Sequence, residues 1–173
     1  MKGYKRINRD DLSLRPFYCF QKGLAFLSAG EENGCNAMTV AWGELGTLFN
    51  LPVATVFARP QRYTREFLDR SGWFTLSFPG EEEKNALNYM GTHSGREEDK
   101  IAAAGLTKGF DNAGHTLYIR ESELVLVCRK IYQGILKESG FTDPEVIRKN
   151  YPLKDFHFVY IGKVEEIYAR MKT

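Results

Sequence analysis

The sequence predicts a mainly β fold, an antiparallel barrel that carries short helices. Segments rich in β-branched and aromatic residues occur towards both ends of the chain, and the helix-like segments inserted between them are short. Aromatic residues make up 13% of the 173 residues, which also favours strands. The length suits one hydrophobic core, and no repeat or low-complexity tract divides the chain. We therefore expect one domain, residues 15–173, preceded by a polar and basic arm, residues 1–14.

The expected strands are short apolar or alternating segments bounded by turn residues. They lie at residues 17–20, 23–29, 36–43, 53–58, 73–78, 116–119, 124–133 and 156–168. The expected helices lie at residues 64–71, 81–90, 97–104 and 143–148. Asp143 is a typical N-cap residue, Pro144 suits the first helical position, and Gly105 suits a helix end. Residues 43–52 contain Gly and Pro and are expected to form a connection.

Residues 36–43 alternate between large and small side chains. Every second residue, namely Met38, Val40 and Trp42, is large enough to fill a core. The residues between them are small or carry a hydroxyl group, as Thr39 and Ala41 do. Because successive strand residues point to opposite faces, the small face would let a flat ligand approach the backbone closely.

The sharpest local signal is the turn RPQRYT, residues 59–64, between an expected strand and an expected helix. A helix N-terminus presents free backbone N–H groups and the positive end of the helix dipole, and guanidinium groups bind phosphate oxygens. One interpretation is therefore a site for phosphate or another anion. The other is a helix start with two solvated arginines, and the residues alone leave both open.

Other polar residues have plainer interpretations when taken alone. The turn Ser94-Gly95-Arg96, followed by Asp99 and Lys100, is typical of a capped helix start. A histidine at the start of a strand, such as His157, is most often structural. The three His and three Cys residues show no metal-ligand spacing, so no metal site is predicted. No catalytic triad stands out, and no G-x-G-x-x-G motif follows a strand, which excludes a separate Rossmann domain.

Composition limits the partners and the compartment. The formal net charge of +2 is too small to indicate nucleic-acid binding. An odd number of cysteines favours reduced thiols, with Cys19 and Cys128 as buried apolar residues. The N-terminus lacks the apolar core of a signal peptide, and no apolar run approaches the length of a membrane span. We therefore expect a cytoplasmic protein that binds neither membranes nor nucleic acid.

Several motifs occur together in one order along the chain. They are N-x-M-T-x-x-W-G from Asn36, R-P-Q-R-Y-T from Arg59 and W-F-T-L-S-F from Trp73. In these motifs the sequence resembles the flavin reductase-like family of FMN-binding split-barrel proteins, and the flavoredoxin branch most closely. The turn at Ser94 and the run H-F-V-Y-I-G-K-V from His157 add to the resemblance, which covers roughly residues 15–168.

The resemblance implies a six-stranded antiparallel Greek-key FMN-binding split barrel, a homodimer, and FMN in a groove near the subunit interface. It implies that one segment lines the flavin ring, comprising Asn36, Ala37, Met38, Thr39, Val40, Ala41 and Trp42. The residues expected at the ribityl phosphate are Arg59, Arg62, Tyr63 and Thr64. Those expected beside the flavin, or where a nicotinamide nucleotide docks, are Ser94, Arg96 and Lys100. His157 is a candidate substrate contact, and no catalytic residue is expected, because the cofactor carries hydride transfer.

Three functions remain open from the sequence. The first is an FMN-binding oxidoreductase that passes electrons from NAD(P)H, a transient donor, through FMN to free flavin or another acceptor. The alternative is a flavoredoxin-type FMN electron carrier, which exchanges electrons with redox protein partners and has little NAD(P)H activity of its own. The third is a split-barrel protein that binds another ligand or none.

Overall fold

The fold is built on one large antiparallel sheet. The computed structural model describes residues 1–21 and 24–171. The strands of the sheet follow the order β3-β2-β6-β9-β10-β5-β4, and β1 pairs with β10. Their bounds are β1 Tyr4–Arg6, β2 Ala25–Glu31, β3 Gly34–Val40, β4 Gly43–Leu48, β5 Leu51–Ala58, β6 Trp73–Pro79, β9 Ser122–Ile135 and β10 Phe158–Arg170. A separate hairpin comprises β7 Lys108–Phe110 and β8 Leu117–Ile119.

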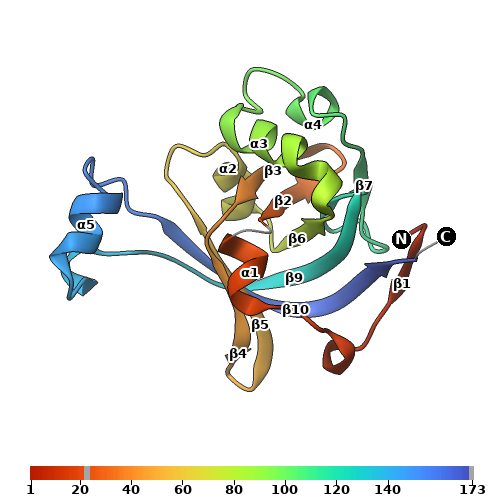
Figure 1. Ribbon diagram of the computed structural model, residues 1–173, viewed down its shortest axis with the longest axis horizontal. Coiled ribbons are helices and arrows are strands. Elements are labelled where there is room, and N and C mark those ends of the chain that lie inside the picture. The colour runs from red at the N-terminus through yellow and green to blue at the C-terminus, as the bar shows by residue number, and fades with distance from the viewer. Residues whose placement is uncertain (22–23, 172–173) are drawn as a thin grey trace.

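Six of these strands, in the order β3-β2-β6-β9-β10-β5, enclose the main hydrophobic core (Figure 1). Each of them contributes buried side chains, including Leu27, Phe74 and Tyr160, none of which has measurable exposure. Burial of this apolar surface is the main favourable term in folding. The predicted six-stranded antiparallel Greek-key barrel is confirmed, and β1 and β4 are additional strands at its margin.

Short helices surround the barrel. They are α1 Pro16–Gln21, α2 Thr64–Arg70, α3 Lys84–Thr92, α4 Lys100–Ala103 and α5 Pro144–Asn150, with single 3₁₀ turns at Arg9–Asp11, Glu81–Glu83 and Glu138–Gly140. A second core lies where α3 and α4 pack beside β2 and β3, and it includes Phe26, Met90 and Ile101. Among the described residues, no helix has the length and apolar character needed to cross a membrane.

The segment 136–157, which we call the α5 excursion, leaves the barrel between β9 and β10. Figure 1 shows α5 standing apart from the barrel, at the end of these two strands. An aromatic cluster of Phe141, Tyr151 and Phe156 holds the excursion together, with ring centroids 4.8–5.7 Å apart. Asp143 accepts a hydrogen bond from the backbone N–H of Glu145, which confirms the predicted N-cap. The excursion thus has its own small apolar core.

The expectation of a strand at residues 17–20 is wrong, because this segment forms α1. A four-residue apolar run has no period that separates a strand from a buried helix turn. The helix buries Cys19 and Phe20 and exposes Phe17 and Tyr18. The helix begins at Pro16, a residue that favours the first helical position.

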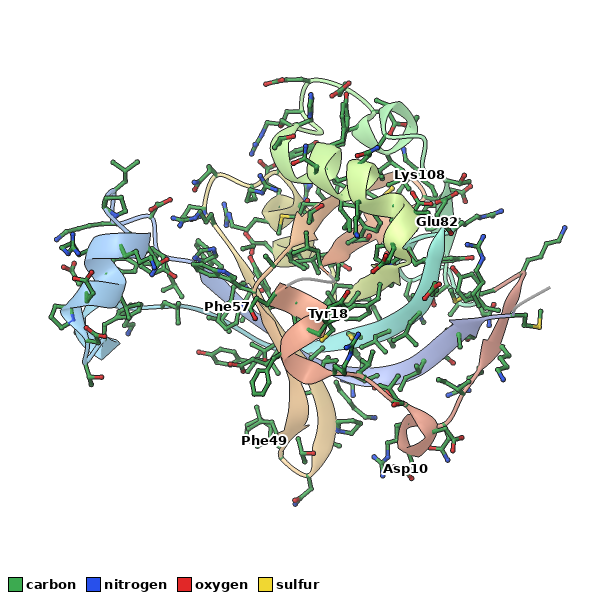
Figure 2. The ribbon with its side chains drawn as sticks, viewed as in Figure 1. Asp10, Tyr18, Phe49, Phe57, Glu82 and Lys108 are labelled. Atoms are coloured by element: carbon green, nitrogen blue, oxygen red, sulfur yellow. The ribbon has the colours of Figure 1, made fainter. Side chains whose placement is uncertain are left out.

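The expectation of a plain connection at residues 43–52 is also wrong, because β4 and β5 form a hairpin there. Leu48 pairs with Leu51, and the two residues between them, Phe49 and Asn50, both adopt positive φ, 53° and 57°. That backbone matches the two-residue turn favoured in hairpins. Its usual signature, Asn-Gly or Asp-Gly, is missing, and Phe49 lies exposed at the tip (Figure 2).

The N-terminal residues pair with the sheet, whereas the sequence predicted a polar and basic arm. Tyr4 pairs with Arg170 in the β1–β10 ladder, and its hydroxyl donates to the backbone carbonyl of Ser122 over 2.6 Å.

Smaller differences concern element ends: β2 begins at Ala25, with Gly23 outside the described residues, and α4 is shorter than the expected helix at 97–104. The predicted burial of Cys19 and Cys128 is confirmed, and burial raises the pKa of both thiols.

Candidate functional site

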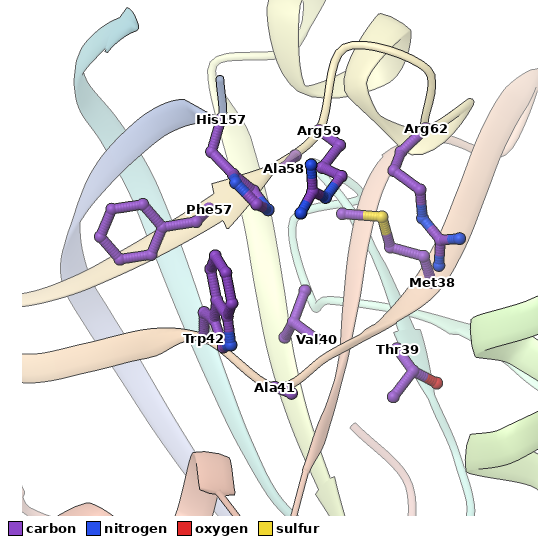
Figure 3. A pocket seen from close by; sticks show the side chains of 10 residues that line it. All are labelled: Met38, Thr39, Val40, Ala41, Trp42, Phe57, Ala58, Arg59, Arg62 and His157. Carbon is purple, nitrogen blue, oxygen red and sulfur yellow. The ribbon is translucent and has the colours of Figure 1, made fainter. Parts of the chain in front are cut away.

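A cavity of about 260 Å³ opens where β3 and β5 end and β10 begins. Its lining residues are Met38, Thr39, Val40, Ala41, Trp42, Phe57, Ala58, Arg59, Arg62 and His157 (Figure 3). Strand register explains how distant segments meet here. Phe158 pairs with Ala58 in the antiparallel β10–β5 ladder, so the residues just outside it, His157 and Arg59, come side by side.

The floor of the cavity is formed by the end of β3. This strand pairs with β2 on one side and is an edge strand of the sheet among the described residues. An edge strand presents backbone N–H and C=O groups that no neighbouring strand takes up. Met38 and Val40 are buried in the core, as predicted from the alternation, whereas Trp42, expected on the same face, is 44% exposed. Thr39 donates to the backbone carbonyl of Leu87 over 2.5 Å. The strand ends at Val40, so Ala41 and Trp42 form the bend into β4.

One end of the cavity is aromatic. The rings of Trp42 and His157 lie with centroids 4.7 Å apart, and Phe57 lies beside them (Figure 3). His157 is 7% exposed, and its Nδ1 lies 2.9 Å from the hydroxyl of Tyr151 in the α5 excursion. Burial and the nearby charge of Arg59 lower the pKa of His157 to about 4, against the opposite effect of Asp155. His157 is therefore neutral at physiological pH.

Arg59 lies in the middle of the cavity wall, but other groups already bind its guanidinium. It donates to the carboxylate of Asp155 over 2.6 Å and to the backbone carbonyl of Asn150 over 2.8 Å. Hydrogen bonds from Gln61 and Arg59 lower the pKa of Asp155. The charge of Arg59 is thus neutralised by the α5 excursion.

Arg62, at the other end, has a different environment. Its Nη1 donates to the backbone carbonyl of Gly91 over 2.8 Å, and no carboxylate of the described residues lies within ion-pair distance. Burial lowers its pKa. Lys100 lies nearby, is 3% exposed, and donates to the carbonyls of Met90 and His93 over 2.9 and 3.1 Å. Burial, and then the charge of Arg62, lower the pKa of Lys100 to about 8.

The half-buried Arg62 and the buried Lys100 thus lie near each other, and neither forms an ion pair with a carboxylate of the described residues, although the charge of Glu98 partly opposes the lowering of the Lys100 pKa. A buried charge without a counter-ion is costly. An anion bound beside Arg62 would relieve that cost. The sequence suggested an anion site at residues 59–64, and within that turn the geometry favours Arg62.

Several predicted site residues do not line the cavity: Asn36, Ala37, Tyr63, Thr64, Ser94, Arg96 and Lys100. Four of them contact one another in two pairs. Asn36 donates to the hydroxyl of Thr64 over 2.9 Å, and both side chains are buried. Arg96 donates to Glu66 and lies over the ring of Tyr63, 4.7 Å from its centroid.

Lys100 is described above, and Ser94 and Ala37 have structural roles as well. Ser94 accepts a hydrogen bond from the backbone N–H of Arg96 over 3.2 Å, and Ala37 is buried in the second core. Conversely, sequence reasoning missed Phe57, Tyr151 and Asp155. The position of Phe57 before the RPQRYT turn was an available signal, whereas nothing in the sequence pointed to the other two.

The cavity suits a flat ligand that carries an anionic group. The open edge of β3 offers hydrogen bonds in one plane, Trp42 offers an aromatic face, and Arg62 offers an unpaired positive charge. A larger hollow of about 540 Å³ adjoins the cavity and shares Ala41, Trp42 and Phe57 with it. Among the described residues, no group of three or more His, Cys, Asp and Glu side chains could hold a metal ion.

The barrel and its cavity define a split-barrel protein with a ligand site at the barrel edge. Residues 17–172 match the family model described as "Flavin reductase like domain", so the chain belongs to the flavin reductase-like family. The predicted family is confirmed. The search of curated proteins gave no match.

Solved structures with the same fold include three informative relatives. An FMN-binding domain of a flavin reductases-like enzyme from Shewanella baltica OS155 has a TM-score of 0.70 and 18% identity, over 96% of this chain and 77% of that chain. Flavoredoxin from Methanosarcina acetivorans has a TM-score of 0.66 and 21% identity, over 94% and 73%. An FMN-binding protein from Thermus thermophilus, with bound 1-cyclohex-2-enone, has a TM-score of 0.66 and 22% identity, over 96% and 81%. At these identities the likeness shows the fold.

Proposed function

We propose that this chain binds FMN in the cavity and acts as an oxidoreductase, passing electrons from NAD(P)H through FMN to free flavin or another acceptor. Membership of the flavin reductase-like family and the FMN-binding relatives support the cofactor. The observation that carries the proposal is the half-buried Arg62 beside the open edge of β3, because it joins an anion site to a planar hydrogen-bonding edge.

The residues present fit FMN at both of its ends. The pyrimidine edge of a flavin alternates hydrogen-bond acceptors with a donor, and an edge strand alternates N–H and C=O groups with a similar spacing. The ribityl phosphate carries nearly two negative charges at neutral pH, which would offset the charges of Arg62 and Lys100. Arg59 contributes less in this view, since Asp155 already neutralises it.

FMN would supply the hydride and electron transfer, and the chain would bind and orient it. Backbone N–H groups at the end of β3 would donate to the ring and stabilise negative charge on it. Trp42 and His157 would close the aromatic end and exclude water there. A nicotinamide nucleotide would bind transiently over the flavin, in the open cavity.

The test begins with an absorbance spectrum of the purified protein before and after FMN is added. Anaerobic titrations with NADH and NADPH follow, with free flavin as acceptor. We expect a flavin spectrum and bleaching by at least one of the two donors. A protein that gains no flavin absorbance refutes FMN binding. A flavin-loaded protein that oxidises neither donor refutes the NAD(P)H activity and leaves FMN binding standing.

The second candidate is a flavoredoxin-type electron carrier. Its support is the structural likeness to flavoredoxin from Methanosarcina acetivorans and the lack of a dedicated nucleotide-binding motif in the sequence. This candidate predicts stoichiometric FMN that stays bound through gel filtration and is reduced by a redox protein but not by NADH or NADPH. The titrations above therefore separate the two candidates.

We also propose that two copies of the chain associate as a homodimer. The hollow beside the cavity includes apolar residues of α1, β5 and the segment after β3, together with Gln21 and Glu44, and Phe17 there is 86% exposed. Large apolar groups left exposed in this way mark interaction surfaces. Light scattering after size-exclusion chromatography tests the proposal, and a monomer at micromolar concentration contradicts it.

A further inference from the structure

Tyr151 and His157 form a buried pair at the aromatic end of the cavity. Tyr151 is 3% exposed and belongs to the α5 excursion, outside the barrel. Its hydroxyl oxygen lies 2.9 Å from Nδ1 of His157, and the two rings meet edge to face with centroids 5.6 Å apart. Neither the family resemblance nor the predicted site assigns a role to Tyr151.

The direction of this hydrogen bond follows from the acid–base properties of the two groups. A phenol is a stronger acid than a neutral imidazole N–H, and an imidazole nitrogen is a stronger base than a phenol oxygen. The hydroxyl of Tyr151 is therefore the donor, and Nδ1 of His157 is the acceptor.

This arrangement determines where the imidazole proton lies. In a neutral imidazole, the nitrogen that accepts a hydrogen bond carries no proton, so the proton of His157 lies on Nε2. No hydrogen bond to Nε2 is found within the described part of the chain, and His157 lines the cavity beside the face of Trp42 (Figure 3). The free N–H is thus available to a ligand.

We propose that Tyr151 is a positioning residue that holds His157 as the neutral Nε2–H tautomer, and that this N–H donates to an uncharged carbonyl oxygen of a flat substrate stacked near Trp42. A carboxamide or an enone has the required acceptor. The substrate half of this inference rests on the proposed function, whereas the tautomer half does not.

The charged groups around the pair agree with an uncharged donor. Arg59 faces His157 from the end of β5 and disfavours an imidazolium, while Asp155, which favours one, is held by Arg59 over 2.6 Å. Burial of the His157 ring also disfavours the imidazolium. His157 therefore presents an N–H without a positive charge, which suits a neutral carbonyl better than a carboxylate.

The tautomer is measured by long-range ¹H–¹⁵N correlation spectra of the full chain at pH 7, with ¹⁵N-labelled histidine. The chain has three His residues, and the variant His157→Gln identifies the signals of His157. We expect the Nε2–H pattern in the wild type and a loss of the single tautomer in Tyr151→Phe. The matched control is Tyr132→Phe, at a tyrosine that is 53% exposed, and it should leave the pattern unchanged. An Nδ1–H or doubly protonated His157, or an unchanged pattern in Tyr151→Phe, overturns the proposal.

Steady-state kinetics with NADH and NADPH test the substrate half. Losing one neutral hydrogen-bond donor from its preferred orientation should raise KM about 2- to 10-fold in Tyr151→Phe, with kcat and the Kd for FMN little changed. His157→Gln keeps an uncharged N–H donor, so its KM should lie nearer the wild-type value than that of His157→Leu. Equal KM values in these two variants, or a loss of FMN affinity that matches the change in KM, refute the carbonyl contact. If the wild type oxidises neither donor, the proposed function fails, and the spectra still decide the role of Tyr151.

Discussion

Replacing Arg62 by Gln tests the anion site directly. The variant removes a half-buried guanidinium that donates to the carbonyl of Gly91 over 2.8 Å and has no carboxylate partner among the described residues. A hydrogen bond to a charged group contributes about 1.5–3 kcal/mol. Since about 1.4 kcal/mol corresponds to a factor of ten, the Kd for FMN should rise about 10- to 100-fold.

Replacing Arg59 by Gln provides the contrast within the same cavity. The guanidinium of Arg59 already binds Asp155 over 2.6 Å and the carbonyl of Asn150 over 2.8 Å. Its loss should therefore lower the free energy of unfolding by on the order of 1 kcal/mol, because the ion pair is partly exposed. The Kd for FMN should change by less than about fivefold, since the charge of Arg59 is already neutralised.

Titration of the apoprotein with FMN and with riboflavin measures both effects. Riboflavin lacks the phosphate, so Arg62→Gln should bind it as the wild type does. Three results would refute the reasoning: wild-type affinity of Arg62→Gln for FMN, an equal loss for riboflavin, or a greater loss in Arg59→Gln than in Arg62→Gln.

Three further predictions concern stability. Burial lowers the pKa of His157 from 6.5 to about 4, so the unfolded chain takes up a proton in this window that the folded chain does not. The free energy of unfolding should fall by on the order of 1–3 kcal/mol as pH decreases from 6.5 to 4, and urea denaturation should show a smaller fall in His157→Gln. Burial lowers the pKa of Lys100 from 10.5 to about 8. The free energy of unfolding should therefore rise as pH increases from 8 towards 10, and Lys100→Met should lack this rise in the same assay. In Gly162→Ala the new Cβ would lie 2.5 Å from the ring of Phe74, so thermal denaturation should show a loss of about 1–3 kcal/mol. Gly46→Ala, with no neighbouring atom within 4 Å, should lose much less, and equal losses would contradict the packing argument.

The parts of the fold that were predictable from the sequence are those in which the local residue pattern determines the local structure. The alternation predicted a strand with Met38, Val40 and Trp42 on its core face, and it was right for Met38 and Val40 but wrong for Trp42, which lies beyond the end of β3 and is exposed. The turn after Ala58 predicted a helix start. Local patterns failed where another segment decided the outcome. Phe49 adopts positive φ because β4 and β5 pair around it, and a Phe residue does not signal that backbone.

The candidate site shows the same division. The cavity-lining residues Thr39 and Arg62 were predicted from two segments that are close in sequence. The contact between Arg59 and Asp155 joins residues 96 positions apart, and only the register of β5 with β10 brings them together. Strand register at that distance is a property of the whole barrel, so no local pattern could show that Arg59 is already neutralised.

The α5 excursion has a consequence for how this protein can diverge from its relatives. It supplies Tyr151, Asp155 and the carbonyl of Asn150, which set the state of His157 and Arg59, yet its aromatic cluster packs outside the barrel. Insertions and substitutions between β9 and β10 can therefore alter the charge and hydrogen bonding of the cavity while the barrel core stays the same. Because Asp155 of this segment also pairs with Arg59, exchanging the segment would change the cavity and, to a smaller extent, the free energy of unfolding.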